Sequence, residues 1–206
     1  MQRTSFSVDK DVAVLSRHTV YQGFTRLDVL SLNHRLFAGG MSPVLRRELV
    51  VRPEAVGVLV YDPLLDAVLL VEQFRVGALA DNHPWQLEIV AGLMDGDGES
   101  LEAVARREVQ EEAGVSLMRL ERVMSFLLSP GGSNERFTLF AGQADLAQAG
   151  GVHGLPSEGE DIRVVVLAAD AVAGMLAAGH IGNAPALIAL QWLVANKMHL
   201  QQRWRS

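Results

Sequence analysis

Three glutamates in the segment GESLEAVARREVQEEAGV (residues 98–115) have the types and spacing to hold a divalent cation. On a helix, residues three and four apart share a face, so Glu108, Glu111 and Glu112 would project their carboxylates to one side. Like charges at this spacing repel each other, and a cation would relieve the repulsion. Carboxylate oxygens favour Mg²⁺ or Mn²⁺, which retain waters and bridge phosphate oxygens. The alternative interpretation is a solvated acidic helix face.

The residues around these glutamates favour the metal interpretation. The order is Glu99, seven residues, Arg107-Glu108, an aliphatic residue, one residue, Glu111-Glu112, one residue and Gly114-Val115. This order resembles the Nudix box, a long and fixed pattern. The resemblance implies a Nudix hydrolase, with an α/β/α sandwich around a mixed sheet and Mg²⁺ as cofactor, with Mn²⁺ as the alternative cation.

The resemblance also implies roles for individual residues of the motif. Glu108 and Glu112 would be metal ligands, and the carbonyl of Ala91 would complete a metal shell. Glu111 would be a supporting ligand or would bind the attacking water, which makes it a catalytic candidate.

Glu99 and Arg107 would stabilise the loop–helix–loop structurally. The opening glycine departs from the family pattern, because Gly92 lies seven residues before Glu99, one residue farther than in the family motif. We interpret the loop of residues 93–98 as one residue longer, with the metal carboxylates intact.

Further stretches narrow the resemblance to the branch of the family that hydrolyses ADP-ribose. They are YQGFTRLDV, HRLFAGGMSPVLRREL, VEQFR, PWQLEIVAG, SFLLSPGGSNER and IGNAPALIALQWL. We therefore expect hydrolysis of the pyrophosphate bond of ADP-ribose to AMP and ribose 5-phosphate. One alternative is another nucleoside diphosphate sugar, such as GDP-mannose or ADP-glucose. Another is a ligand sensor with a Nudix fold and no turnover.

Arg47, Arg52 and Arg75 are the candidate cations for the substrate, since a guanidinium can bind phosphate or ribose oxygens in a bidentate manner. Surface ion pairs on strands are the alternative for each of them. Phe24 could stack on adenine or could be an ordinary core phenylalanine. The remaining substrate-binding candidates follow from the resemblance: Glu48, Leu93, Ser129, Gly131 and Glu135.

The acidic segment SEGEDIRV (residues 157–164) offers a base for the attacking water. A carboxylate on a mobile loop near a metal can take a proton once substrate closes the site. By alignment with the family, Glu158 is the base candidate and Glu160 contacts a metal. A solvated acidic loop is the alternative.

Two domains are expected to position these residues. Extended runs between Val12 and Arg52, broken at Gly23 and at Gly39-Gly40, predict a small antiparallel β module as domain 1–53. The resemblance implies that this module pairs across a two-fold axis to form a homodimer and contributes Phe and Arg contacts to the partner's site. Residues 54–206 form the predicted Nudix domain.

Its strands are predicted around AVGVLVY, AVLLVEQF, LEIVAGLM, residues 123–128, residues 137–144 and IRVVVL. Ser100 is the predicted cap of the glutamate-bearing helix, which Gly114 ends. A Gly-rich acidic loop covers residues 150–161, and further helices are expected near residues 169–178 and 184–204. Strands mixed with helices in this order predict an α/β/α sandwich.

The composition excludes several other classes of protein. The chain has 206 residues, no cysteine and a formal net charge of −6, with 18 basic and 24 acidic residues and no basic block. These features argue against disulfides, thiolate chemistry and a nucleic-acid partner. With neither a signal-peptide pattern nor a membrane span, we expect a cytoplasmic protein with a small-molecule substrate.

Overall fold

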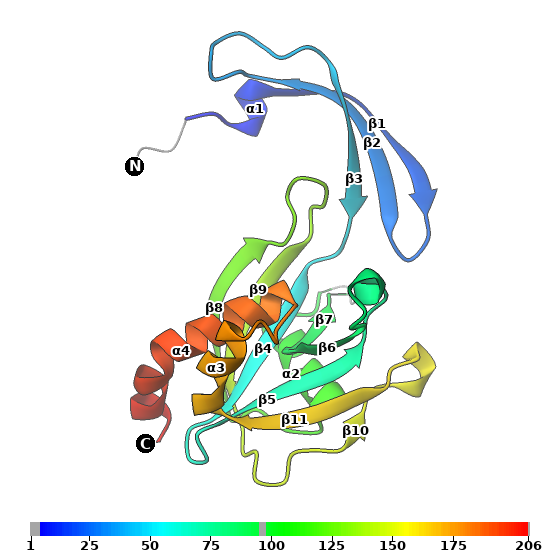
Figure 1. The fold of residues 1–206 in the computed structure, drawn as a ribbon. Helices are drawn as coiled ribbons and strands as arrows, with labels where there is room; N and C mark the ends of the chain where they lie inside the picture. Colours follow the sequence, from blue (N-terminus) through cyan, green and yellow to red (C-terminus); the bar gives the residue numbers. More distant parts are fainter. Residues whose placement is uncertain (1–4, 95–97, 206) are drawn as a thin grey trace. The chain divides into compact units, whose positions relative to one another are not determined.

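The computed structural model describes residues 5–94 and 98–205, and these divide into two compact units. The N-terminal unit comprises Met1–Pro53 together with Leu127–Glu135, and the larger unit comprises Glu54–Phe126 and Arg136–Ser206. Figure 1 shows the fold as a ribbon. The loop of residues 127–135 groups with the N-terminal unit, although it follows a strand of the other sheet. The functions that we expect of the two domains stay predictions.

The N-terminal unit is a three-stranded antiparallel sheet in the order β1-β2-β3. Its elements are α1 (Val8–Asp11), β1 (Val12–Gln22), β2 (Arg26–His34) and β3 (Leu45–Val51). The loop of residues 127–135 runs beside β3, where Val50 N–H donates to the Gly132 carbonyl at 2.8 Å. The antiparallel β module predicted from the sequence is therefore confirmed.

The larger unit is built on an eight-stranded mixed sheet with the main order β10-β11-β5-β4-β9-β8. The pairs β10–β11, β11–β5 and β4–β5 are antiparallel, whereas β4 and β9 run parallel. The strands are β4 (Ala55–Asp62), β5 (Ala67–Phe74), β6 (Trp85–Glu88), β7 (Val90–Leu93), β8 (Arg119–Leu127), β9 (Arg136–Gln143), β10 (Val152–His153) and β11 (Ile162–Ala168). The mixed α/β fold is as predicted.

Helices cover both faces of this sheet (Figure 1). They are α2 (Leu101–Ala113), α3 (Val172–Ala177) and α4 (Ala184–Trp204), with 3₁₀ turns η1 (Val76–Asp81), η2 (Pro156–Glu158) and η3 (Ala169–Ala171). Val58 and Val60 of β4 belong to the apolar core that contains α2. Tyr61, the next residue along, faces α4, where its hydroxyl accepts from Gln201 Nε2 at 3.0 Å. Alternate side chains of the central strand β4 thus point to opposite faces of the sheet, and both faces are buried, as a sandwich requires.

The boundaries around α2 agree with the sequence prediction. Ser100 Oγ accepts from Ala103 N–H at 3.2 Å, and Gly114 ends the helix in the left-handed conformation with φ 66°. α4 likewise begins at a cap, since Asn183 Oδ1 accepts from Ala186 N–H at 3.1 Å. No helix in the described ranges is long and apolar enough to cross a membrane.

One sequence prediction is wrong in a way that matters for the site. LEIVAGLM was expected to form a single strand, but it is divided at Ile89 between β6 and β7. β4 and β5 pair directly only from Val60 to Asp62, so beyond that point they diverge. Where they diverge, β5 pairs with β6 and β4 pairs with β7, both in antiparallel orientation. The division places Glu88 and Ala91 on either side of the bend.

Smaller differences occur elsewhere in the chain. β8 begins at Arg119, four residues before the predicted start, and the helix expected over residues 169–178 begins as the 3₁₀ turn η3. The expected loop of residues 150–161 contains β10 and η2. Part of the interpreted loop insertion, residues 95–97, lies outside the described residues.

Candidate active site

Helix α2 positions the glutamates because its apolar face is buried in the core of the larger unit. Val104, Ala105 and Val109 are fully buried against residues of β4 and β5. Glu112 follows Val109 by three residues, so the same face carries its side chain inward. Only 3% of Glu112 is exposed, and 13% of the Glu108 side chain. The solvated acidic face that the sequence left open is therefore excluded for these two residues.

Strand β7 passes directly beneath the two buried carboxylates. Ala91 N–H donates to Glu112 Oε2 at 3.2 Å. A Cβ atom built on Gly92 would lie 2.1 Å from the carboxyl carbon of Glu108, which is far inside contact distance. A side chain at this position would therefore displace the Glu108 carboxylate from its place beside β7. Gly92 therefore has a steric function consistent with the opening glycine of the motif.

Burial disfavours the charged form of these two carboxylates unless a cation compensates the charge. Desolvation is the largest cause that raises the pKa of Glu112 to about 8, and the charges of Glu108 and Glu160 add to it. The pKa of Glu108 rises to about 7, again first through desolvation, with Glu111 and Glu160 adding while Arg107 lowers it. A bound cation would hold both groups in the charged form. Buried carboxylate oxygens beside a backbone strand fit a hard divalent ion such as Mg²⁺.

Glu160 contributes charge to this cluster, but its carboxylate binds its own loop. Glu160 Oε2 accepts from Leu155 N–H at 2.9 Å, within the segment that contains η2. Within residues 5–94 and 98–205, three or more acidic, histidine or cysteine side chains do not converge into a ready-made metal site. The structure thus brings Glu108 and Glu112 together and leaves Glu160 turned toward Leu155.

The acidic segment is tethered to the C-terminal end of α2. Gly154 N–H donates to the Glu111 carbonyl at 3.2 Å, and His153 packs against Gly114, where a Cβ would lie 2.6 Å from its ring. Glu158 lies in the exposed turn η2, and its N–H donates to the Leu155 carbonyl at 2.9 Å. The base candidate Glu158 therefore lies on an exposed turn, and the residues just before this turn, His153 and Gly154, contact α2.

Arg107 connects the acidic residues on the outer side of α2. Its Nη1 lies 2.8 Å from Glu108 Oε1 and 3.1 Å from Glu111 Oε2, and its Nε lies 3.6 Å from Glu99 Oε1. The contact with Glu99 is the one that the motif implies. Glu111 faces this arginine, and 29% of its side chain is exposed. Leu93, at the end of β7, is partly buried.

Arg75 has a partner that the sequence analysis missed. Its Nη2 donates to Glu88 Oε2 at 2.8 Å, and its Nε lies 3.1 Å from the same oxygen and 3.3 Å from Oε1. Asn183 Nδ2 donates to Glu88 Oε1 at 2.9 Å. The missed signal was a carboxylate inside the apolar run LEIVAGLM, since a glutamate in a buried strand requires partners.

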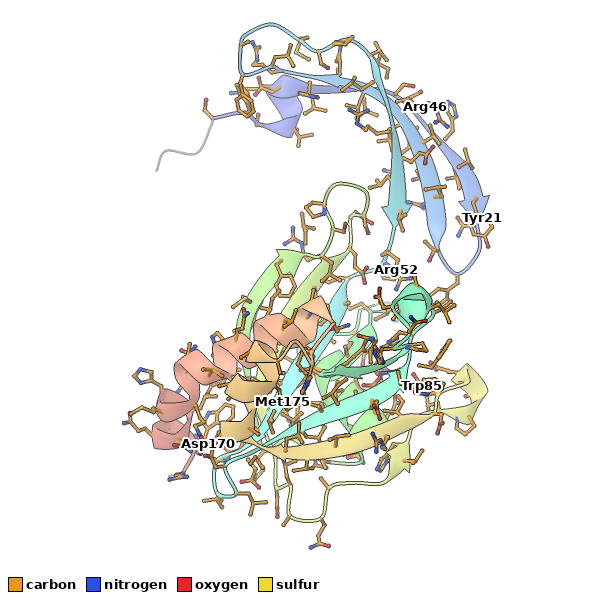
Figure 2. All side chains as sticks on the ribbon, in the orientation of Figure 1. Tyr21, Arg46, Arg52, Trp85, Asp170 and Met175 are labelled. Carbon is orange, nitrogen blue, oxygen red and sulfur yellow. The ribbon has the colours of Figure 1, made fainter. Side chains whose placement is uncertain are left out.

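The other substrate-binding candidates belong to the N-terminal unit and are described within it. The Arg52 guanidinium lies 5.3 Å from the Phe24 ring centroid, and its Nε lies 3.8 Å from Glu135 Oε2. Phe24 is 86% exposed, which excludes the core alternative. Figure 2 labels Arg52 just beyond the end of β3. The structure thus brings three of the candidates together from separate parts of the sequence.

The rest of this set is more dispersed. Arg47 donates through Nη1 to the Arg46 carbonyl at 3.0 Å, and Glu48 pairs with Arg46 at 3.1 Å. Ser129 forms the turn of the 127–135 loop, where its carbonyl accepts from Ser133 N–H at 2.9 Å. Gly131 lies in the same turn with open space around it.

Comparison with known proteins places these features in a family. The NUDIX domain model matches residues 51–202. The chain is 45% identical over 195 residues to the ADP-ribose pyrophosphatase of Escherichia coli (strain K12), which covers 94% of this chain and 93% of that protein. It is 33% identical over 153 residues to the GDP-mannose pyrophosphatase of Enterobacter sp. (strain 638), covering 72% of this chain and 77% of that protein.

Among solved structures, the chain superposes on an ADP compounds hydrolase with a TM-score of 0.69 and 21% identity. That match covers 96% of this chain and 98% of the other, and it shows a shared fold. The family model spans more than half of the chain, and the motif glutamates Glu108, Glu111 and Glu112 lie on α2. The chain therefore belongs to the Nudix family of hydrolases.

Proposed function

We propose that this enzyme hydrolyses the pyrophosphate bond of ADP-ribose to AMP and ribose 5-phosphate with Mg²⁺, which Mn²⁺ can replace. The observation that carries the proposal is the buried pair Glu108 and Glu112, held against β7 with raised pKa values that a cation would offset. The substrate assignment rests on the 45% identity to an ADP-ribose pyrophosphatase over nearly the whole of both chains.

The proposed ligands of the cation are Glu108, Glu112 and the carbonyl of Ala91, with Glu160 joining when it leaves Leu155. The bound cation would neutralise pyrophosphate oxygens and favour ionisation of the attacking water. The N–H of Ala91 fixes the Glu112 carboxylate from one side, and Gly92 leaves room for that of Glu108. The hydrogen bond from Ala91 thus orients the Glu112 carboxylate before substrate binds.

The chain's own residues supply the remaining chemistry. Glu158 would accept the proton of the attacking water, and its place on an exposed turn lets it approach once substrate is bound. Glu111, beside Arg107, would orient that water. Arg75 would bind the pyrophosphate oxygens as a planar guanidinium.

In the N-terminal unit, the exposed Phe24 ring and the Arg52 guanidinium supply stacking surfaces for adenine. Glu135 lies beside Arg52 and would restrain it. We also propose contacts with the substrate from Arg47, Glu48, Leu93, Ser129 and Gly131.

We propose that the N-terminal unit forms a homodimer. Strand β1 exposes large apolar side chains, as expected of a surface that another chain covers; they are Val14, Leu15, Val20 and Tyr21, each more than half exposed. Tyr21 is labelled near the end of β1 in Figure 2. Sedimentation velocity should give twice the 22.4 kDa chain mass. A species of single-chain mass at micromolar concentration would contradict the proposal.

A panel of substrates tests the catalytic proposal. ADP-ribose, GDP-mannose and ADP-glucose are each incubated with the purified enzyme and Mg²⁺ or Mn²⁺, and kcat/KM is measured for each. We expect ADP-ribose to give the highest value. A higher kcat/KM for GDP-mannose would overturn the assignment of ADP-ribose as the substrate, but the protein would still be a hydrolase. Binding of ADP-ribose without turnover of any compound would establish the ligand-sensor alternative.

A further inference from the structure

Glu88 is a buried carboxylate that does not belong to the motif helix. Only 4% of the residue is exposed, at the end of β6 just before the bend at Ile89. It accepts hydrogen bonds from Arg75 Nε and Nη2 and from Asn183 Nδ2. A buried carboxylate needs such partners, and here they come from the end of β5 and the start of α4. Both oxygens of Glu88 are therefore committed to these two residues.

The contact with Glu88 occupies one edge of the Arg75 guanidinium. Nε and Nη2 face the carboxylate, while Nη1 donates to no group of the residues that the structure describes. The Arg75 side chain is 44% exposed, against 6% for Glu88. A guanidinium held by one edge in this way is fixed in its plane and keeps donors for an anion.

Arg75 lies within electrostatic reach of the proposed metal ligands. Desolvation lowers the pKa of Arg75, but the hydrogen bonds and charge of Glu88 outweigh it, and Glu112 and Glu160 raise the pKa further. In turn, the charge of Arg75 lowers the pKa of Glu112. The carboxylates that would hold the cation are therefore competing partners for this guanidinium.

Asn183 also restrains the Glu88 carboxylate. Its Nδ2 binds Glu88 Oε1, while its Oδ1 accepts from Ala186 N–H as the cap of α4. The cap fixes the side-chain amide, and the amide fixes the carboxylate. The start of α4 is thus joined through two side chains to the arginine.

We propose that Glu88, oriented by Asn183, is a positioning residue that presents the free edge of Arg75 to the pyrophosphate and keeps its guanidinium away from the metal-binding carboxylates. The proposal rests on the proposed function, which supplies the pyrophosphate and the cation. Loss of Glu88 would free Arg75 to move toward Glu112 and Glu160. Substrate binding and cation binding would then weaken together.

Glu88→Gln tests this, because the amide keeps the shape of the side chain and removes the charge that holds the guanidinium. We expect KM for ADP-ribose to rise about tenfold or more, with a smaller effect on kcat, since a clamp acts on ground and transition states alike. Mn²⁺ binding to the substrate-free protein, measured by electron paramagnetic resonance, should weaken severalfold. The matched control is Glu72→Gln on β5, whose partner Arg163 belongs to a surface ion pair; it should change neither quantity.

Two further variants separate positioning from folding. Asn183→Asp keeps an oxygen to cap α4 but replaces the amide donor by a carboxylate facing Glu88, so it should reproduce the rise in KM without loss of helix content. In an Arg75→Ala background, which itself raises KM, Glu88→Gln should cause no additional rise in KM, because Glu88 acts through Arg75. Thermal melts identify any variant that fails to fold.

The outcomes distinguish this inference from the proposed function. If Glu88→Gln lowers the melting temperature but leaves KM and Mn²⁺ affinity within twofold of the parent, Glu88 is only a structural residue and the inference is overturned. An additive effect in the Arg75→Ala background also overturns it. If the parent does not hydrolyse ADP-ribose, the proposed function fails, while Mn²⁺ binding by Glu88→Gln still decides whether Glu88 holds Arg75 away from the carboxylates.

Discussion

Removing the charge of Glu112 should stabilise the metal-free protein at pH 8 while it abolishes activity. Burial is the largest cause that raises the pKa of Glu112 to about 8, whereas the pKa of a glutamate in the unfolded chain is about 4.5. Between these values the folded protein keeps a proton that the unfolded chain has lost. The free energy of unfolding of the metal-free protein therefore falls as the pH rises through this window.

The size of this effect on the free energy of unfolding follows from the pKa shift of Glu112. One pKa unit corresponds to about 1.4 kcal/mol, so burial of Glu112 should cost the metal-free protein about 4 kcal/mol at pH 8. For a chain of this length, that is about 10 °C in melting temperature. Glutamine carries no charge and keeps an oxygen for the Ala91 N–H. Glu112→Gln should therefore melt about 10 °C higher than the parent at pH 8 and at a similar temperature near pH 4.5.

The assay is a series of thermal melts from pH 4.5 to 8.5 in chelator, repeated with Mg²⁺. Mg²⁺ should restore the stability of the parent at pH 8, because a ligand that binds only the folded state stabilises it. Mg²⁺ should raise the melting temperature of Glu112→Gln only slightly. Glu102→Gln, an exposed glutamate in the first turn of the same helix, is the control and should follow the parent. A metal-free parent whose melting temperature is flat from pH 5 to 8, or a variant less stable than the parent at pH 8, would refute this reasoning.

Other substitutions probe separate parts of the account. Gly92→Ala should displace the Glu108 carboxylate and shift the Mg²⁺ activation curve to higher concentration, with an unchanged circular dichroism spectrum. An unshifted activation curve would contradict the steric function assigned to Gly92. Glu158→Gln should lower kcat by roughly 10²- to 10⁴-fold and leave Mg²⁺ activation intact, as expected for loss of a base; full turnover would place the base elsewhere. Tyr61→Phe, which removes a hydrogen bond to Asp66, should cost about 1 kcal/mol in denaturant titrations and leave kcat unchanged; a fall in kcat would contradict its structural assignment.

Much of the local structure could be predicted from the sequence because it depends on short-range patterns. The cap at Ser100, the helix end at Gly114 and the apolar stripe of Leu101, Val104, Ala105 and Val109 each depend on residues close together in the sequence. The glutamate spacing predicted which side chains share a face. These features sufficed to place Glu108 and Glu112 together.

The division of LEIVAGLM could not be predicted in this way. A continuous apolar run is compatible with one buried strand, and periodicity alone does not show where neighbouring strands diverge. The bend at Ile89 exists because β4 and β5 separate, which is a property of the whole sheet. The placement of Ala91 beneath Glu112 follows from that bend.

Partners that are distant in sequence were also missed. Glu88 binds Arg75, 13 residues away, and Asn183, 95 residues away. Arg75 was predicted as a substrate cation from its motif alone, and that assignment stays a prediction. What the structure adds is the buried carboxylate that holds one edge of its guanidinium, which local sequence patterns do not encode.

The most direct test of the central claim is a ³¹P NMR time course of ADP-ribose with Mg²⁺, run in parallel with the parent enzyme and Glu112→Gln. We expect the parent to convert the pyrophosphate resonances into those of AMP and ribose 5-phosphate, and we expect chelator to stop the reaction. Glu112→Gln, folded and more stable without metal, should leave the pyrophosphate intact over the same period. Equal rates for the two proteins, or turnover by the parent in excess chelator, would contradict the claim that these buried carboxylates hold the catalytic cation.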